Sequence, residues 1–170
     1  MEEPIVNRVA KSGLITLDLA EYYPQGERVL LDIKEQLFQG LLLREKDFRD
    51  YIKNTDWSQY QGQFVAVICS SDAIIPQWAY MLLSVKLTPH AQKVVFGTLE
   101  ELEDRLFIEA LQQIKAEDYQ DKMVVIKGCG DIPVPSSAYV EIASKLQPFV
   151  KSIMYGEPCS TVPVYKKPRK

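Results

Sequence analysis

The residues best suited to chemistry in this sequence are its three cysteines, Cys69, Cys129 and Cys159. A thiolate is both a soft metal ligand and a nucleophile, so each of them could bind a metal or attack an electrophile. Each also follows a segment that we expect to be a β-strand, namely 64–68, 123–127 and 150–155. Because the carboxyl ends of parallel strands meet at one edge of a sheet, these positions predict a shared site there.

Two acidic residues lie close enough in the sequence to complete such a site. Asp72 follows Cys69, and Asp131 follows Cys129, so either carboxylate could serve as a fourth, oxygen ligand. Three thiolates with an aspartate or a water suit tetrahedral zinc or an iron–sulfur unit. The spacing of the cysteines matches none of the compact zinc patterns, so this prediction of a metal site rests on their placement at strand ends.

Two other interpretations remain open. In the first, the protein is a thiol-dependent enzyme with Cys69 or Cys129 as nucleophile, because Lys127 and the helix N-termini expected after both cysteines would favour the thiolate. The sole histidine, His90, is expected in a loop before a strand, which argues against a cysteine–histidine pair. In the second, the protein is a non-catalytic interaction domain whose cysteines are small core residues.

The elements that must position these residues alternate between strands and helices. Strands are expected at 13–19, 28–33, 64–68, 93–96, 123–127 and 150–155, and helices at 44–53, 76–83, 98–115 and from Ser136 or Ser137, as N-cap, to 146. Thr98 followed by Glu101 has the pattern of a capping box. This order predicts an α/β fold, a mainly parallel (mixed) sheet with helices packed on its faces.

Size and composition predict one domain with one core. We find no linker and no long-period repeat, so the single α/β domain is expected at 1–165, followed by a solvated basic C-terminal tail at 166–170. A net charge of −3 argues against nucleic-acid binding. No stretch is apolar enough for a membrane span or a signal peptide, which predicts a cytoplasmic protein. Self-association into a homo-oligomer stays open.

Several segments also resemble a known family. They are 6–10, 12–19, 43–49, 69–82, 126–129 and 151–163. Together they resemble an uncharacterised bacterial family of the Bacteroidetes that is catalogued as a domain of unknown function. The resemblance covers nearly the whole chain and implies a single-domain bacterial cytoplasmic protein, without implying an activity. The ligand set of three cysteines and an aspartate is chemically similar to that of iron–sulfur scaffold proteins.

Overall fold

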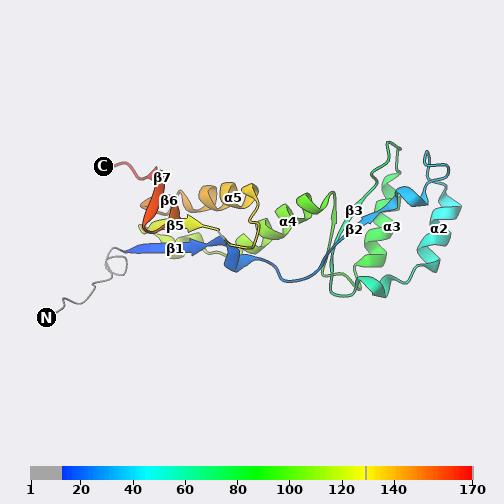
Figure 1. Ribbon diagram of the computed structural model, residues 1–170, viewed down its shortest axis with the longest axis horizontal. Coiled ribbons are helices and arrows are strands. Elements are labelled where there is room, and N and C mark those ends of the chain that lie inside the picture. Colours follow the sequence, from blue (N-terminus) through cyan, green and yellow to red (C-terminus); the bar gives the residue numbers. More distant parts are fainter. Residues whose placement is uncertain (1–12, 129, 170) are drawn as a thin grey trace. The chain divides into compact units, whose positions relative to one another are not determined.

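The computed structural model describes residues 13–128 and 130–169, which form two compact units (Figure 1). Unit 1 is built from the chain up to Pro24 and from Leu106 onward, and unit 2, Gln25–Arg105, is inserted into it. Chain length led us to expect one core, whereas the buried apolar residues form two separate clusters, one in each unit. Mixed α/β content with mainly parallel sheets confirms the predicted fold class.

Unit 1 contains a four-stranded sheet in the order β1-β5-β6-β7. The strands β1, β5 and β6 are parallel, and β7 returns antiparallel to β6 as a hairpin. The elements are β1 (Leu14–Asp18), the 3-10 helix η1 (Leu19–Tyr22), the end of α4 (Leu99–Leu111), η4 (Ala116–Tyr119), β5 (Met123–Lys127), α5 (Ser136–Leu146), β6 (Ser152–Glu157) and β7 (Ser160–Lys166).

Unit 2 contains a three-stranded parallel sheet in the order β2-β3-β4. The central strand β3 is apolar and almost entirely buried, as expected for a strand covered on both faces. The elements are β2 (Arg28–Asp32), η2 (Ile33–Gln36), α2 (Glu45–Asn54), η3 (Trp57–Tyr60), β3 (Phe64–Ile68), α3 (Gln77–Leu87), β4 (Lys93–Phe96) and the beginning of α4.

The two units repeat one another, which corrects our expectation that the chain has no long-period repeat. Residues 57–97 of unit 2 align with 116–156 of unit 1 at a constant offset without a gap, so that η3, β3, α3 and β4 correspond to η4, β5, α5 and β6. Identical residues at equivalent positions include Asp72 and Asp131, Pro76 and Pro135, Tyr80 and Tyr139, Pro89 and Pro148, and Gly97 and Gly156. The repeat escaped the sequence analysis because few positions are identical.

The strand registers and turns repeat as well. Phe64 pairs with Lys93 in unit 2, and the equivalent Met123 pairs with Ser152 in unit 1. Gly62 N–H donates to His90 O at 2.9 Å, while the equivalent Asp121 N–H donates to Phe149 O, also at 2.9 Å. Both donors have positive φ, +72° and +57°. The same backbone geometry therefore recurs in both units although the side chains differ.

Glycine is required where the third parallel strand of each unit ends. Gly97 follows β4 with φ +135°, and the equivalent Gly156, near the end of β6, has φ +117°. Other residues rarely adopt these angles. A Cβ on Gly97 would also collide with the carboxylate of Glu101, which folds back to cap α4. The glycine thus makes room for the capping box predicted from Thr98 and Glu101, and the structure confirms that capping box.

Three local expectations need correction. No side-chain cap hydrogen bond forms at the start of α5, which begins at Ser136 directly after Pro135, so neither serine is the N-cap residue. The strand β7 was not expected, because its valines flank Pro163. Its last residue is Lys166, and Lys167 N–H donates to Lys151 O at 2.9 Å, so the solvated basic end is shorter than expected.

Candidate functional site

The described cysteines lie in different units. Cys69 directly follows β3 in unit 2, is half-buried and packs against the apolar cluster of that unit. Cys159 lies in the exposed turn between β6 and β7 in unit 1, and Cys129 falls outside the described residues. Asp72 and Asp131 are exposed. Within the described ranges no three histidine, cysteine or acidic side chains are grouped so as to hold a metal ion, and the three-cysteine metal site stays a prediction.

At the carboxyl end of the unit 2 sheet, Asp32 organises the loop that follows β3. Its carboxylate accepts hydrogen bonds from the hydroxyl and the backbone N–H of Ser70 and from the N–H of Lys34. Partial burial raises the pKa of Asp32, but the hydrogen bonds from Ser70 and Lys34 outweigh it and hold the pKa below its usual value. Asp32 is therefore a turn-stabilising carboxylate, already engaged by its neighbours.

Tyr80 of α3 brings a phenol close to the same edge. Burial raises the pKa of Tyr80, and the nearby Cys69 and Asp32 raise it further. Its ring meets Phe96 of β4 edge to face, with centroids 5.0 Å apart. A thiol, a carboxylate and a phenol thus gather at this edge, as expected for the carboxyl ends of parallel strands.

The equivalent edge of unit 1 is charged. Lys127, the last residue of β5, has its Nζ 3.5 Å from Asp18 Oδ2 and 3.5 Å from Glu157 Oε1. Asp18 corresponds to Asp32, since both end the first strand and accept a backbone N–H two residues on. Lys127 corresponds to the apolar Ile68, so the two units keep the capping aspartate and differ in what surrounds it.

An apolar groove of about 490 Å³ runs between α5 and the β6–β7 hairpin of unit 1. Val140, Tyr155 and Val164 on its walls are 71%, 50% and 57% exposed. Tyr139 and Tyr155 meet edge to face with centroids 5.7 Å apart, and the Tyr139 hydroxyl donates to Gly128 O at 3.0 Å. The lining residues are Ile126, Ser136, Tyr139, Val140, Ala143, Ile153, Met154, Tyr155 and Val164.

The sequence analysis missed this groove. Val140 and Tyr155 are far apart in the sequence, and β7, which supplies Val164, was not expected. The available signal was the repeat itself: Tyr139 and Tyr155 correspond to Tyr80 and Phe96, so the same aromatic pair occurs in both units.

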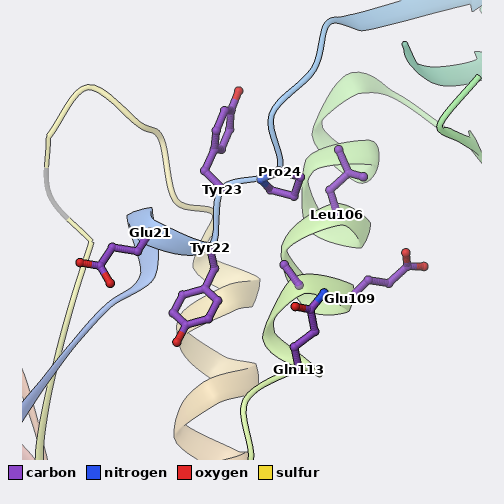
Figure 2. Close-up of a pocket in the computed structure, with 8 residues that line it drawn as sticks. Glu21, Tyr22, Tyr23, Pro24, Leu106, Glu109 and Gln113 are labelled. Carbon is purple, nitrogen blue, oxygen red and sulfur yellow. The ribbon is translucent and has the colours of Figure 1, made fainter. Parts of the chain in front are cut away.

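A second hollow of unit 1, of about 380 Å³, lies between the segment after β1 and α4. Figure 2 shows Tyr22, Tyr23 and Pro24 on one side and Leu106, Glu109 and Gln113 on the other. The carboxylates of Glu21 and Glu109 point away from each other in this view. A general acid and a general base must each reach the substrate atom on which they act, and these two carboxylates do not face a shared space in this view.

The fold defines a duplicated α/β protein. Unit 2 is inserted into the sequence of unit 1, and both units share the same arrangement of three parallel strands; unit 1 has the antiparallel strand β7 in addition. The chain belongs to the family described as "Protein of unknown function (DUF2480)", whose family model matches residues 3–167. No curated protein and no solved structure matches the chain. None of the helices in the described ranges has the length and apolar character to cross a membrane.

Proposed function

We propose that this protein is a non-catalytic binding module, and that the groove between α5 and the β6–β7 hairpin holds an aromatic or aliphatic side chain of a partner protein. The supporting observation is the groove itself, since its volume falls in the range of roughly 300–1,000 Å³ typical of binding pockets. Its lining is mostly apolar, with hydroxyls from Ser136, Tyr139 and Tyr155 to orient an occupant.

The exposure of the walls supports the same proposal. Val140, Tyr155 and Val164 expose half or more of their surface, although each is apolar or aromatic. A contiguous group of exposed apolar side chains costs free energy in water and marks interaction surfaces in globular proteins. Covering them with an apolar side chain of a partner would remove that cost.

The repeat provides a matched control for the test. Val140 on α5 corresponds to Met81 on α3, which is 67% exposed and lines a different hollow of about 270 Å³ in unit 2. We expect Val140→Asp to weaken binding of the apolar dye anilinonaphthalene sulfonate at the unit 1 groove at least tenfold, and Met81→Asp to leave binding at that groove unchanged. Because both sites are exposed, neither variant should change the free energy of unfolding, measured by urea titration, by more than about 0.5 kcal/mol.

Partner binding is tested with the same pair. A protein that is retained by the parent and by Met81→Asp, but lost with Val140→Asp, would support the proposal once its complex places an apolar side chain in the groove. Equal dye binding by Val140→Asp and the parent would overturn it.

The metal hypothesis is kept as a second proposal. The observation in its favour is the contact between Lys127 and Glu157. These residues precede Cys129 and Cys159 by two positions each, so the contact joins the two chain segments that lead into these cysteines. Elemental analysis of protein purified without chelator should find stoichiometric zinc or iron that Cys129→Ser removes, and metal-free protein would refute it. We also propose that the chain works in the cytoplasm, where its cysteines would stay reduced.

A further inference from the structure

We propose that the outer edge of β4 in unit 2 binds an extended segment of a partner protein, which adds to the sheet as an antiparallel strand. This inference concerns a different unit from the groove and does not depend on it. It rests on the correspondence between β4 and β6, because β6 shows what that edge accepts.

The two strands occupy the same place in the repeated architecture. Both are the third parallel strand of their unit, and Phe64–Lys93 in unit 2 and Met123–Ser152 in unit 1 are equivalent register pairs. In unit 1 the outer edge of β6 carries β7 over its whole length. In unit 2, as far as residues 13–128 and 130–169 are concerned, β4 pairs with β3 alone.

The backbone of β4 is oriented to accept such a strand. Gly97 N–H donates to Val67 O of β3 at 2.9 Å. Since the backbone groups of successive residues in a strand point alternately to its two sides, those of Val94 and Phe96 point to the outer edge. Their equivalents in β6 are Ile153 and Tyr155, which pair with Tyr165 and Val162 of β7.

The side chains beside this edge are apolar. Phe96 is 66% exposed and stands edge to face with Tyr80, as Tyr155 does with Tyr139 in unit 1. In unit 1, Val164 of β7 lines the same groove as Tyr139 and Tyr155. An added strand with a similar residue would lie beside Phe96 in the same way.

The pairing of β6 with β7 specifies the chemistry of the occupant. Tyr155 has the β-branched Val162 opposite it, and Ile153 has the aromatic Tyr165. The partner segment is therefore extended and antiparallel, with a β-branched residue opposite Phe96 and an aromatic residue opposite Val94. Backbone hydrogen bonds would supply affinity and these side chains specificity, as in other cases of strand addition.

The edges of β1 and β2 do not support the same inference. They are the first strands of their units and correspond to each other, and neither shows an added strand among the described residues. Within the part of the chain that the structure describes, an added strand lies only on the third-strand edge of unit 1, which is why we assign the site to the equivalent edge of β4.

The test uses the full chain and a synthetic peptide with the sequence of Ser160–Lys166, followed by amide NMR. We expect saturable shifts at Val94, Val95 and Phe96, slower hydrogen exchange at the outward-pointing N–H groups of Val94 and Phe96, and no effect from a scrambled peptide. A peptide that perturbs only β6 and β7, or nothing saturably, would overturn the proposal.

Two substitutions at one position separate backbone from side chain. Val94→Pro removes an outward N–H that β3 does not use, a change that edge strands tolerate. Val94→Ala removes side-chain atoms and keeps the N–H. We expect the proline variant to lose at least tenfold in peptide affinity and the alanine variant to lose less than threefold; equal affinity of the two would contradict a backbone-mediated site.

A third variant and an independent measurement keep the test decisive if Val94→Pro fails to fold. Phe96→Asp retains the backbone groups and should weaken peptide binding at least tenfold, because it replaces the exposed apolar ring that the peptide would contact by a charged carboxylate; unchanged binding would count against the proposal. If sedimentation instead shows a dimer whose β4 amides are protected without peptide, the occupant is a second copy and the partner-strand proposal is wrong.

Discussion

Leu83 and Ile142 offer a direct test of whether the two units are separate cores. They occupy equivalent positions on α3 and α5, and both are fully buried, each in the apolar cluster of its own unit. Replacing Leu83 by alanine removes three carbon atoms, worth roughly 2.4 kcal/mol at about 0.8 kcal/mol each. The cavity left behind adds to this, so we expect a loss of about 3 kcal/mol or more.

The informative readout is where the structure opens, measured by native-state hydrogen exchange. We expect Leu83→Ala to speed exchange more than a hundredfold at the amides of β3 and β4, since about 1.4 kcal/mol corresponds to a factor of ten. The amides of β5 and β6 should change less than threefold. Ile142→Ala should give the mirror result, with fast exchange in β5 and β6.

Val85 provides the control, because it lies on the same helix as Leu83 but is 67% exposed. Val85→Ala should therefore leave hydrogen exchange unchanged in both units. If Leu83→Ala speeds exchange equally in both units, the two clusters unfold as one cooperative core, and the reasoning from separate cores is refuted.

Three further predictions concern local interactions. Thr98→Ala should destabilise the protein by about 1 kcal/mol in urea titrations, because Glu101 N–H loses its cap acceptor 3.3 Å away; a neutral result would mean that the cap contributes nothing. Asp32→Asn should lower the melting temperature at pH 7. Because the folded pKa of Asp32 lies below 3.8, its contribution is full above that pH and is lost on acidification, so the difference should shrink below pH 3.8; a constant difference would contradict this. Removing 168–170 should leave the melting temperature unchanged, whereas removing 166–170 should lower it, because Lys167 bonds to Lys151 O and Asp121; equal melting temperatures would show that the end of β7 contributes nothing.

Local patterns predicted most of the elements well. The apolar runs Phe64–Ile68 and Met123–Lys127 are strands with the expected bounds, and Thr98 caps α4 as its spacing from Glu101 indicated. These features depend on neighbouring residues, so a single sequence contains them. The strand β7 was missed because Pro163 is unfavourable in a strand interior and is accommodated here at a sheet edge, where its missing N–H is not needed.

The candidate site was harder to predict, because it depends on which strands share a sheet. Cys69 and Cys159 both follow strands, as expected, but β3 and β6 belong to different sheets. The rule that carboxyl ends of parallel strands meet holds only within one sheet. The groove beside Tyr139 likewise required the pairing of β6 with β7, which no short-range pattern specifies.

The sequence by itself determined the type, the order and most of the bounds of the elements, because these follow from periodicity, capping and turn residues within a few positions of each other. It also contained the repeat of 57–97 in 116–156, although mainly through spacing. Only the tertiary structure decided that β1 pairs with β5, which follows unit 2 in the sequence, and that among the described residues β6 rather than β4 carries an added strand. Such pairings are long-range choices, settled by burial of the separate apolar clusters, and they decide which edges and grooves are exposed for binding.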